Sequence, residues 1–177
     1  MWGDQTKKMK IYVDGKNFLV GLNLWEALHY LRKRADGKRY WIDAICINQT
    51  DIPERNRQLR IMPHIYMRAN LVVVWLGRKY AKYDDEELAI KLAPRSRYKT
   101  SLSPRIEEEL YSDEYWARVW IVQEIGKARK IQVCVGEGGM AWDVFVQMIK
   151  KSIPVVRVGA EKGPLKLEKQ LQEKYRR

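Results

Sequence analysis

One uninterrupted run of apolar residues, from Leu71 to Leu76, constrains the fold of this chain more than any other feature. The run reads Leu-Val-Val-Val-Trp-Leu, so it holds three consecutive β-branched residues, and Gly77 ends it. A strand without polar alternation is typical of a parallel sheet whose two faces are both covered. Because parallel neighbours need long crossover connections, we expect helices to alternate with strands along the rest of the chain.

The segments around this run show that alternation of strand and helix patterns. Alternating apolar residues on both sides of Asp14-Gly15 predict a β-hairpin over residues 9–20, because that dipeptide suits a tight primed turn. The mostly apolar stretch from Tyr40 to Ile47 predicts a second buried strand. Further helices are predicted over 84–92, 113–128 and 140–151, and a further strand over 131–135. This order predicts an α/β fold in which helices flank a parallel sheet.

Two further helices have capping signals at their starts. Asn23 is followed three residues later by Glu26, and Asp51 is followed by Pro53 and Glu54. A side-chain oxygen at the first position accepts a hydrogen bond from the backbone of the first turn, and Pro is tolerated there. We therefore expect Asn23 and Asp51 to be the N-caps of two helices.

The distribution of charge bears on the kind of partner. The 177 residues suit one domain, and 34 Lys and Arg against 22 Asp and Glu give a net charge of +12. Residues 150–177 hold nine basic and three acidic residues, whereas residues 40–77 hold four Arg against three acids. A nucleic-acid reader would carry its charge along the motif-bearing surface. We therefore expect a solvated basic tail and no nucleic-acid partner.

Several classes of protein and of site are excluded by what the sequence lacks. The apolar run ending at Leu76 is far shorter than the roughly 20 residues of a membrane-spanning helix. Cys46 and Cys134 cannot make a framework of disulfides, and His29 and His64 do not lie near them at zinc-ligand spacing. The sequence therefore predicts a reduced, cytoplasmic protein with buried, inert thiols, no metal site and no membrane span.

Three blocks of sequence carry a family resemblance. The first is Trp-Ile-Asp-Ala-Ile-Cys-Ile-Asn-Gln at 41–49, the second is Val-Trp-Leu-Gly at 74–77, and the third is Arg-Val-Trp-Ile-Val-Gln-Glu at 118–124. Together they resemble the heterokaryon incompatibility (HET) domain family of filamentous fungi. The resemblance implies a TIR-like, flavodoxin-like fold and a role in self/non-self recognition and the associated cell death. It also implies action through association with other proteins, including homo-oligomers.

The start of the chain departs from this family pattern. The family opens with a strand that ends in Trp-Gly-Asp, and here only Trp2, Gly3 and Asp4 follow Met1. In a TIR-like sheet that first strand is central, and its loss would leave backbone groups of two neighbours unpaired. We therefore expect an N-terminally truncated HET-like domain over 1–150 and a poorly matched, helical, basic tail over 151–177.

Polar residues at the ends of the predicted strands are candidates for a binding site. In open parallel sheets ligands bind beyond the carboxyl ends of the strands, which here are marked by Asp4, Asn48 and Gln49. Asp43 is a further candidate, since it interrupts an apolar strand and needs a cationic partner or a site to face. The alternative for Asn48 and Gln49 is structural, because such side chains often bond the backbone of a turn.

The third block supplies the candidate catalytic residue, Glu124, four residues after Trp120. TIR domains that cleave NAD carry a glutamate at this spacing, so the resemblance implies an alternative function as an NAD-cleaving hydrolase. Glu124 would stabilise positive charge on the ribose, Trp120 would cover a ring, and Arg55 and Arg118 would hold phosphates. NAD would be the substrate, and no cofactor is required. The structural alternative is a core Trp with a surface Glu paired to Arg118 or Lys127.

Overall fold

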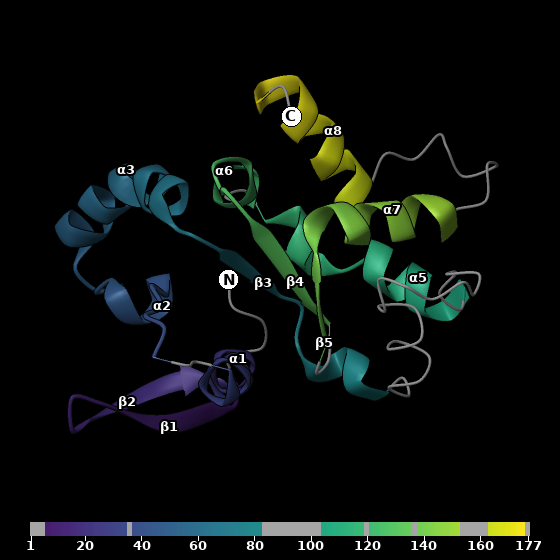
Figure 1. The fold of residues 1–177 in the computed structure, drawn as a ribbon. Helices are drawn as coiled ribbons and strands as arrows, with labels where there is room; N and C mark the ends of the chain where they lie inside the picture. The colour runs from purple at the N-terminus through teal and green to yellow at the C-terminus, as the bar shows by residue number, and fades with distance from the viewer. Residues whose placement is uncertain are drawn as a thin grey trace.

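The computed structural model describes residues 6–34, 37–82, 104–118, 121–135, 138–152 and 163–175. Within them the chain is a mixed α/β fold, with an N-terminal hairpin and a separate three-stranded sheet (Figure 1). The helix predicted over 84–92 lies outside the described residues, as do Asp4 and Trp120. No helix in the described part of the chain combines the length and the apolar character needed to cross a bilayer.

The predicted hairpin is confirmed. Strands β1 (Lys8–Val13) and β2 (Lys16–Gly21) pair antiparallel through a two-residue turn. Asp14 and Gly15 have φ angles of 49° and 75°, as a primed turn requires at both central positions. Helix α1 (Leu22–Lys33) contacts both strands and follows them directly. Its N-cap is Gly21 without a side-chain hydrogen bond, so the prediction that Asn23 caps this helix is wrong.

The predicted strand over 40–47 is also wrong. Residues 38–42 have no regular structure, and a short helix, α2 (Asp43–Cys46), follows. The backbone N–H of Cys46 donates to the carbonyl of Ile42, and that of Ile47 donates to Asp43. Of the segment's apolar residues only Ile47 is fully buried, whereas Cys46 is exposed. The backbone N–H groups thus find their hydrogen-bond acceptors within the segment. The apolar side chains of residues 41–45 are only partly buried.

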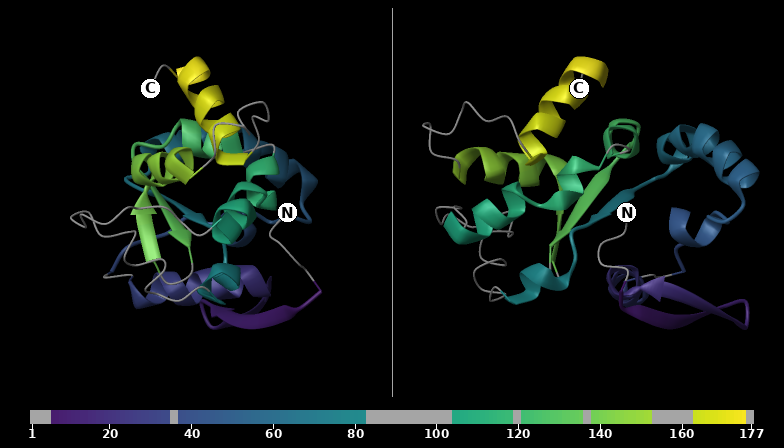
Figure 2. Two further views of the ribbon diagram at one scale, coloured as in Figure 1. Left: turned by 90° about the vertical axis from the view of Figure 1, so that its right-hand side faces the viewer. Right: turned by 180° about the vertical axis from the view of Figure 1, so that it is seen from behind.

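The second predicted capping signal is confirmed. The side chain of Asp51 accepts a hydrogen bond of 2.9 Å from the backbone N–H of Glu54, and helix α3 (Ile52–Arg68) begins after it. Met62 is the buried residue of α3. Helix α3 lies beside α6 (Ile121–Gly126) (Figures 1 and 2).

The central sheet contains the buried parallel strand predicted from the apolar run. Strand β3 (Val72–Trp75) pairs in parallel with β4 (Ile131–Val135), as predicted for both segments. Strand β5 (Gly138–Ala141), which the sequence pattern did not reveal, pairs antiparallel with β4, so the sheet is mixed. Gly77 ends the first of these strands with a φ of 92°, a conformation that favours glycine.

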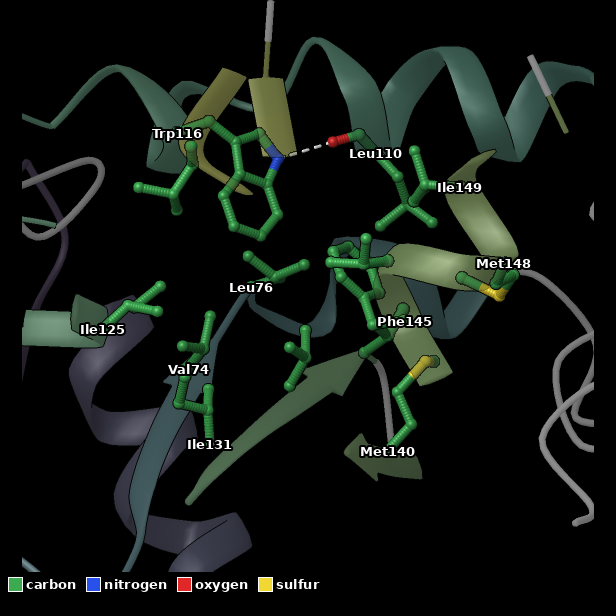
Figure 3. Packing of buried hydrophobic residues seen from close by; sticks show 14 of the residues in the cluster. Val74, Leu76, Leu110, Trp116, Ile125, Ile131, Met140, Phe145, Met148 and Ile149 are labelled. Carbon is green, nitrogen blue, oxygen red and sulfur yellow. Dashed lines mark hydrogen bonds between the residues drawn. The ribbon is translucent and has the colours of Figure 1, made fainter. Parts of the chain in front are cut away.

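Helices cover both faces of this sheet, as the uninterrupted apolar run requires. On one face Val74 and Val133 pack in a large core. Figure 3 shows Val74 within this core. On the other face, Ala27 and Tyr30 of α1 pack against Trp75 and Cys134. The large core also receives residues from α5 (Pro104–Tyr111), α6, α7 (Trp142–Ser152) and α8 (Gly163–Tyr175).

The helix predicted over 113–128 is two helices. A 3₁₀ turn, η2 (Glu114–Ala117), ends at Arg118, whose ψ of 128° is extended, and α6 follows. Asp113 caps η2 by accepting from the N–H of Tyr115. The break lets residues on both sides of it enter the core, since Trp116 before it and Ile121 after it are both buried.

The two cysteines differ in environment. Cys134 is fully buried beside the hydroxyl of Tyr30, and burial raises the pKa of its thiol. Cys46 is exposed, so the expectation that both thiols are buried is wrong for Cys46. Its exposure follows from the short helix α2, which replaces the predicted strand.

Candidate functional site

The residues of the first sequence block form helix α2 and the loop that leads to α3. The side chain of Gln49 donates to the carbonyl of Asp43 at 3.2 Å. Asn48 accepts at its side-chain oxygen from the backbone N–H and the hydroxyl of Thr50, at 3.1 and 2.7 Å. The backbone N–H of Asn48 donates to Glu54 at 3.0 Å. The structure therefore brings Asp43, Asn48 and Gln49 together, and their polar groups bond within the loop.

Asp43 occupies the first turn of α2. One of its carboxylate oxygens accepts a hydrogen bond of 2.7 Å from the backbone N–H of Ala44, and the residue is half-buried. An acidic residue is favourable at a helix N-terminus. The ring of Trp41 meets that of Tyr66 edge-on at 5.9 Å, which packs the block against α3. Asp43 thus has a structural role where the sequence predicted a polar exception in a strand.

The remaining candidates lie on other elements. Arg55 is half-buried in the first turn of α3, and its N–H donates to the carbonyl of Asp51. The guanidinium of Arg118 lies over the ring of Tyr115, 5.1 Å from its centroid. Glu124 lies in α6, the helix beside α3. The described residues thus place Arg55 and Glu124 on two neighbouring helices, and Arg118 after η2.

The second block is explained by a contact that sequence reasoning missed. The indole N–H of Trp75 donates to the side-chain oxygen of Asn23 at 3.1 Å, which ties α1 to β3. A Cβ on Gly77 would lie 3.2 Å from the same oxygen of Asn23. Trp75 and Gly77 therefore both lie against the side-chain amide of Asn23. The sequence predicted that Asn23 caps a helix, whereas in the structure it stabilises this long-range contact.

A surface pocket of about 520 Å³ lies at the opposite end of the sheet from the edge that strand order predicted. It is located where β3 and β4 begin and β5 ends, whereas ligands of open parallel sheets bind at the carboxyl ends. Among the described residues no group of three or more His, Cys, Asp or Glu side chains is arranged to hold a metal ion. The pocket is lined by Leu71, Arg129, Lys130, Ile131, Gln132, Gly139, Met140, Ala141, Trp142 and Asp143.

Comparison with known proteins identifies a family and a relative of this chain. The family model described as "Heterokaryon incompatibility protein (HET)" matches residues 1–124. The Neurospora crassa protein "Heterokaryon incompatibility protein 6, OR allele" is 40% identical over 91 residues, which cover 44% of this chain and 13% of that relative. No solved structure matches the chain, so the TIR-like arrangement that the sequence resemblance implies stays a prediction.

Proposed function

The chain belongs to the heterokaryon incompatibility protein (HET) family, and from this membership we propose that it acts in fungal heterokaryon incompatibility by associating with other proteins. In this proposal the domain relays a self/non-self signal that ends in cell death. It needs no cofactor, because association rather than chemistry carries the signal. The chain corresponds to only 13% of its Neurospora relative, so the activity of a whole protein of this kind is part of the proposal.

One observation supports association over chemistry more than the others. The polar side chains of the first sequence block bond to each other and to the backbone of their own loop, as Gln49 does with Asp43 and Asn48 with Thr50. Large apolar side chains are at the same time exposed on the N-terminal hairpin. Tyr12 and Leu19 of the hairpin have 70% and 64% of their surface exposed. Tyr12 and Leu19 lie on one face of the hairpin, because Leu19 pairs with Lys10 and Asn17 pairs with Tyr12. Exposed apolar groups that gather on one face are typical of surfaces that meet other proteins.

Expression in a filamentous fungus tests this proposal. We expect inducible expression of the chain to arrest colony growth and to let a viability dye enter the cells, because the folded domain engages the incompatibility machinery. The matched control is Phe145→Ala, which removes a side chain at the centre of the core. Equal growth with the wild-type chain and this control at equal protein level contradicts the proposal.

The NAD-cleaving alternative is tested with Glu124, which lies in α6 beside α3. Under the association proposal, Glu124→Ala leaves the growth arrest unchanged and the purified chain releases no nicotinamide from NAD. The control is Glu114→Ala, an exposed glutamate on η2. The opposite result is that the wild-type chain releases nicotinamide and that the rate falls by about 100-fold in Glu124→Ala but not in the control. Catalysis would then replace association as the mechanism.

A further inference from the structure

Helix α3 presents a line of basic side chains to the surface. Arg57, Arg60, His64 and Arg68 are all exposed and follow one another at intervals of three or four residues. Residues at this spacing lie on one face of a helix, and eleven residues of helix rise about 16 Å. Met62, which is buried, marks the opposite face. We call the exposed line, with its apolar neighbours Ile61 and Met67, the arginine face.

The arginine face is not neutralised by acidic groups of the described structure. No ion pair or hydrogen bond joins the side chains of Arg57, Arg60 and Arg68 to other described residues. The two acids at the start of α3 have other roles, because Asp51 caps the helix and Glu54 binds the backbone of Asn48. Residues 40–77 are nearly balanced in charge by count, but Asp51 and Glu54 accept hydrogen bonds from the backbone, from Glu54 and Asn48, and not from the arginines.

The residue types on this face suit a protein partner. All four basic residues of α3 apart from His64 are arginines, although the chain has more lysines than arginines. Arginine binds carboxylates with two parallel hydrogen bonds and, with methionine, is enriched in protein interfaces, where lysine is depleted. Ile61 and Met67, with 47% and 43% of their surface exposed, flank the arginines. The face thus combines fixed positive charge with apolar contact area.

We infer that the arginine face of α3 docks an acidic segment, with apolar side chains among its carboxylates, of a partner protein. The inference rests on the proposed function in taking the partner to be a protein. A second copy of the chain is disfavoured as occupant, since two molecules of net charge +12 repel each other.

Two other anionic surfaces fit the face less well. A helix that binds a membrane inserts a continuous apolar face, and the apolar side of α3 is already packed within the molecule around Met62 and Tyr66. Single-stranded nucleic acid is bound with exposed aromatic rings between the cations, and the exposed positions of α3 hold none. Ile61 and Met67 would have no counterpart on a phosphate backbone.

Binding of a fluorescent peptide tests the inference. The probe is a helical peptide with glutamates along one face and leucines beside them, and its control carries glutamine for each glutamate. Fluorescence anisotropy at physiological salt is expected to show binding of the glutamate peptide alone. The triple variant Arg57→Glu, Arg60→Glu and Arg68→Glu is expected to weaken that binding by at least about tenfold, because three attractive contacts become repulsive.

The matched control is the triple variant Lys16→Glu, Lys33→Glu and Lys150→Glu, which changes net charge equally at exposed positions elsewhere. It is expected to stay within about twofold of wild type, because these lysines lie on β2, α1 and α7 and do not belong to the arginine face. Equal weakening in both triple variants, or equal binding of the glutamine peptide, overturns the inference. The inference is also overturned if a DNA duplex or phosphatidylserine vesicles bind more tightly than the glutamate peptide and the arginine triple variant abolishes that binding.

The growth assay separates this inference from the proposed function. If the wild-type chain arrests growth and the arginine triple variant arrests it equally, the docking inference fails and the proposed function stands. If the peptide binds through the arginine face and the wild-type chain has no effect on growth, the proposed function fails and the docking surface stands. If the arginine triple variant loses both peptide binding and growth arrest, and the lysine triple variant keeps both, the docking inference and the proposed function are both supported.

Discussion

Replacing Asp113 with alanine is expected to lower the free energy of unfolding by about 3 kcal/mol. Its carboxylate is buried and accepts two hydrogen bonds, from the hydroxyl of Tyr80 at 2.5 Å and the backbone N–H of Tyr115 at 2.9 Å. It also forms an ion pair with the ammonium of Lys79 at 2.6 Å. The alanine variant loses the cap of η2 and the charged acceptor of a buried hydroxyl. The contact with Lys79 adds little, because that lysine is half-exposed.

Urea denaturation followed by circular dichroism measures this loss. In a chain of this size the expected change corresponds to a fall in melting temperature of roughly 6–12 °C. Asp113→Asn keeps an oxygen that can cap η2, so it is expected to lose less than the alanine variant. Glu114→Ala, at the exposed neighbouring position, serves as the control and is expected to change stability by less than about 0.5 kcal/mol. A similarly small change in Asp113→Ala shows that the buried carboxylate does not stabilise the fold.

Features with a local physical cause were predictable from the sequence. The turn at Asp14-Gly15 needs two left-handed residues, and those residue types adopt them most readily. Asp51 caps α3 because the backbone N–H it binds is only three residues away. The run from Leu71 to Leu76 predicted a strand covered on both faces, and side chains of β3 do enter both cores. In each case nearby residues alone decide the structure.

Features that depend on distant contacts were not predictable in the same way. The segment around Asp43 is apolar enough for a strand, yet it forms a helical turn, and the ring of Trp41 before it packs against Tyr66 of α3. Strand β5 contains Gly138 and Gly139, which suggest a turn, and it exists through its pairing with β4. The break at Arg118 lies inside a helical pattern and depends on where Trp116 and Ile121 are buried.

In the candidate site, too, local hydrogen bonds were predictable and contacts between distant residues were not. Asn48 and Gln49 were predicted to lie either at a binding edge or in bonds within a turn, and their hydrogen bonds are of the second kind. The contact of Asn23 with Trp75 joins residues 52 positions apart, and that of Tyr80 with Asp113 joins residues 33 apart. One sequence gives no signal for such pairs, since each partner has several plausible local roles. The arginine face was likewise hidden in a balanced count of charges.

Phe145→Ala is expected to be the most destabilising of these changes, with a loss of about 3–5 kcal/mol in the free energy of unfolding. Phe145 is fully buried at the centre of the main core (Figure 3). Its ring stacks on Trp116 with centroids 5.6 Å apart and lies 5.9 Å from that of Trp142. The indole N–H of Trp116 is fixed by a hydrogen bond of 2.7 Å to the carbonyl of Leu110. Because that bond holds the Trp116 ring in place, the core cannot close over the space that alanine leaves.

The neighbouring residue provides the matched control for this core variant. Val144 precedes Phe145 on α7 and is exposed, so Val144→Ala removes apolar volume from the same helix without opening the core. We expect Val144→Ala to change the urea midpoint little, while Phe145→Ala lowers it and reduces the near-ultraviolet circular dichroism of the surrounding tryptophans. Equal midpoints for the two variants would mean that the stack of Phe145 on Trp116 contributes nothing. If both variants unfold before urea is added, α7 as a whole, rather than its buried ring, limits stability.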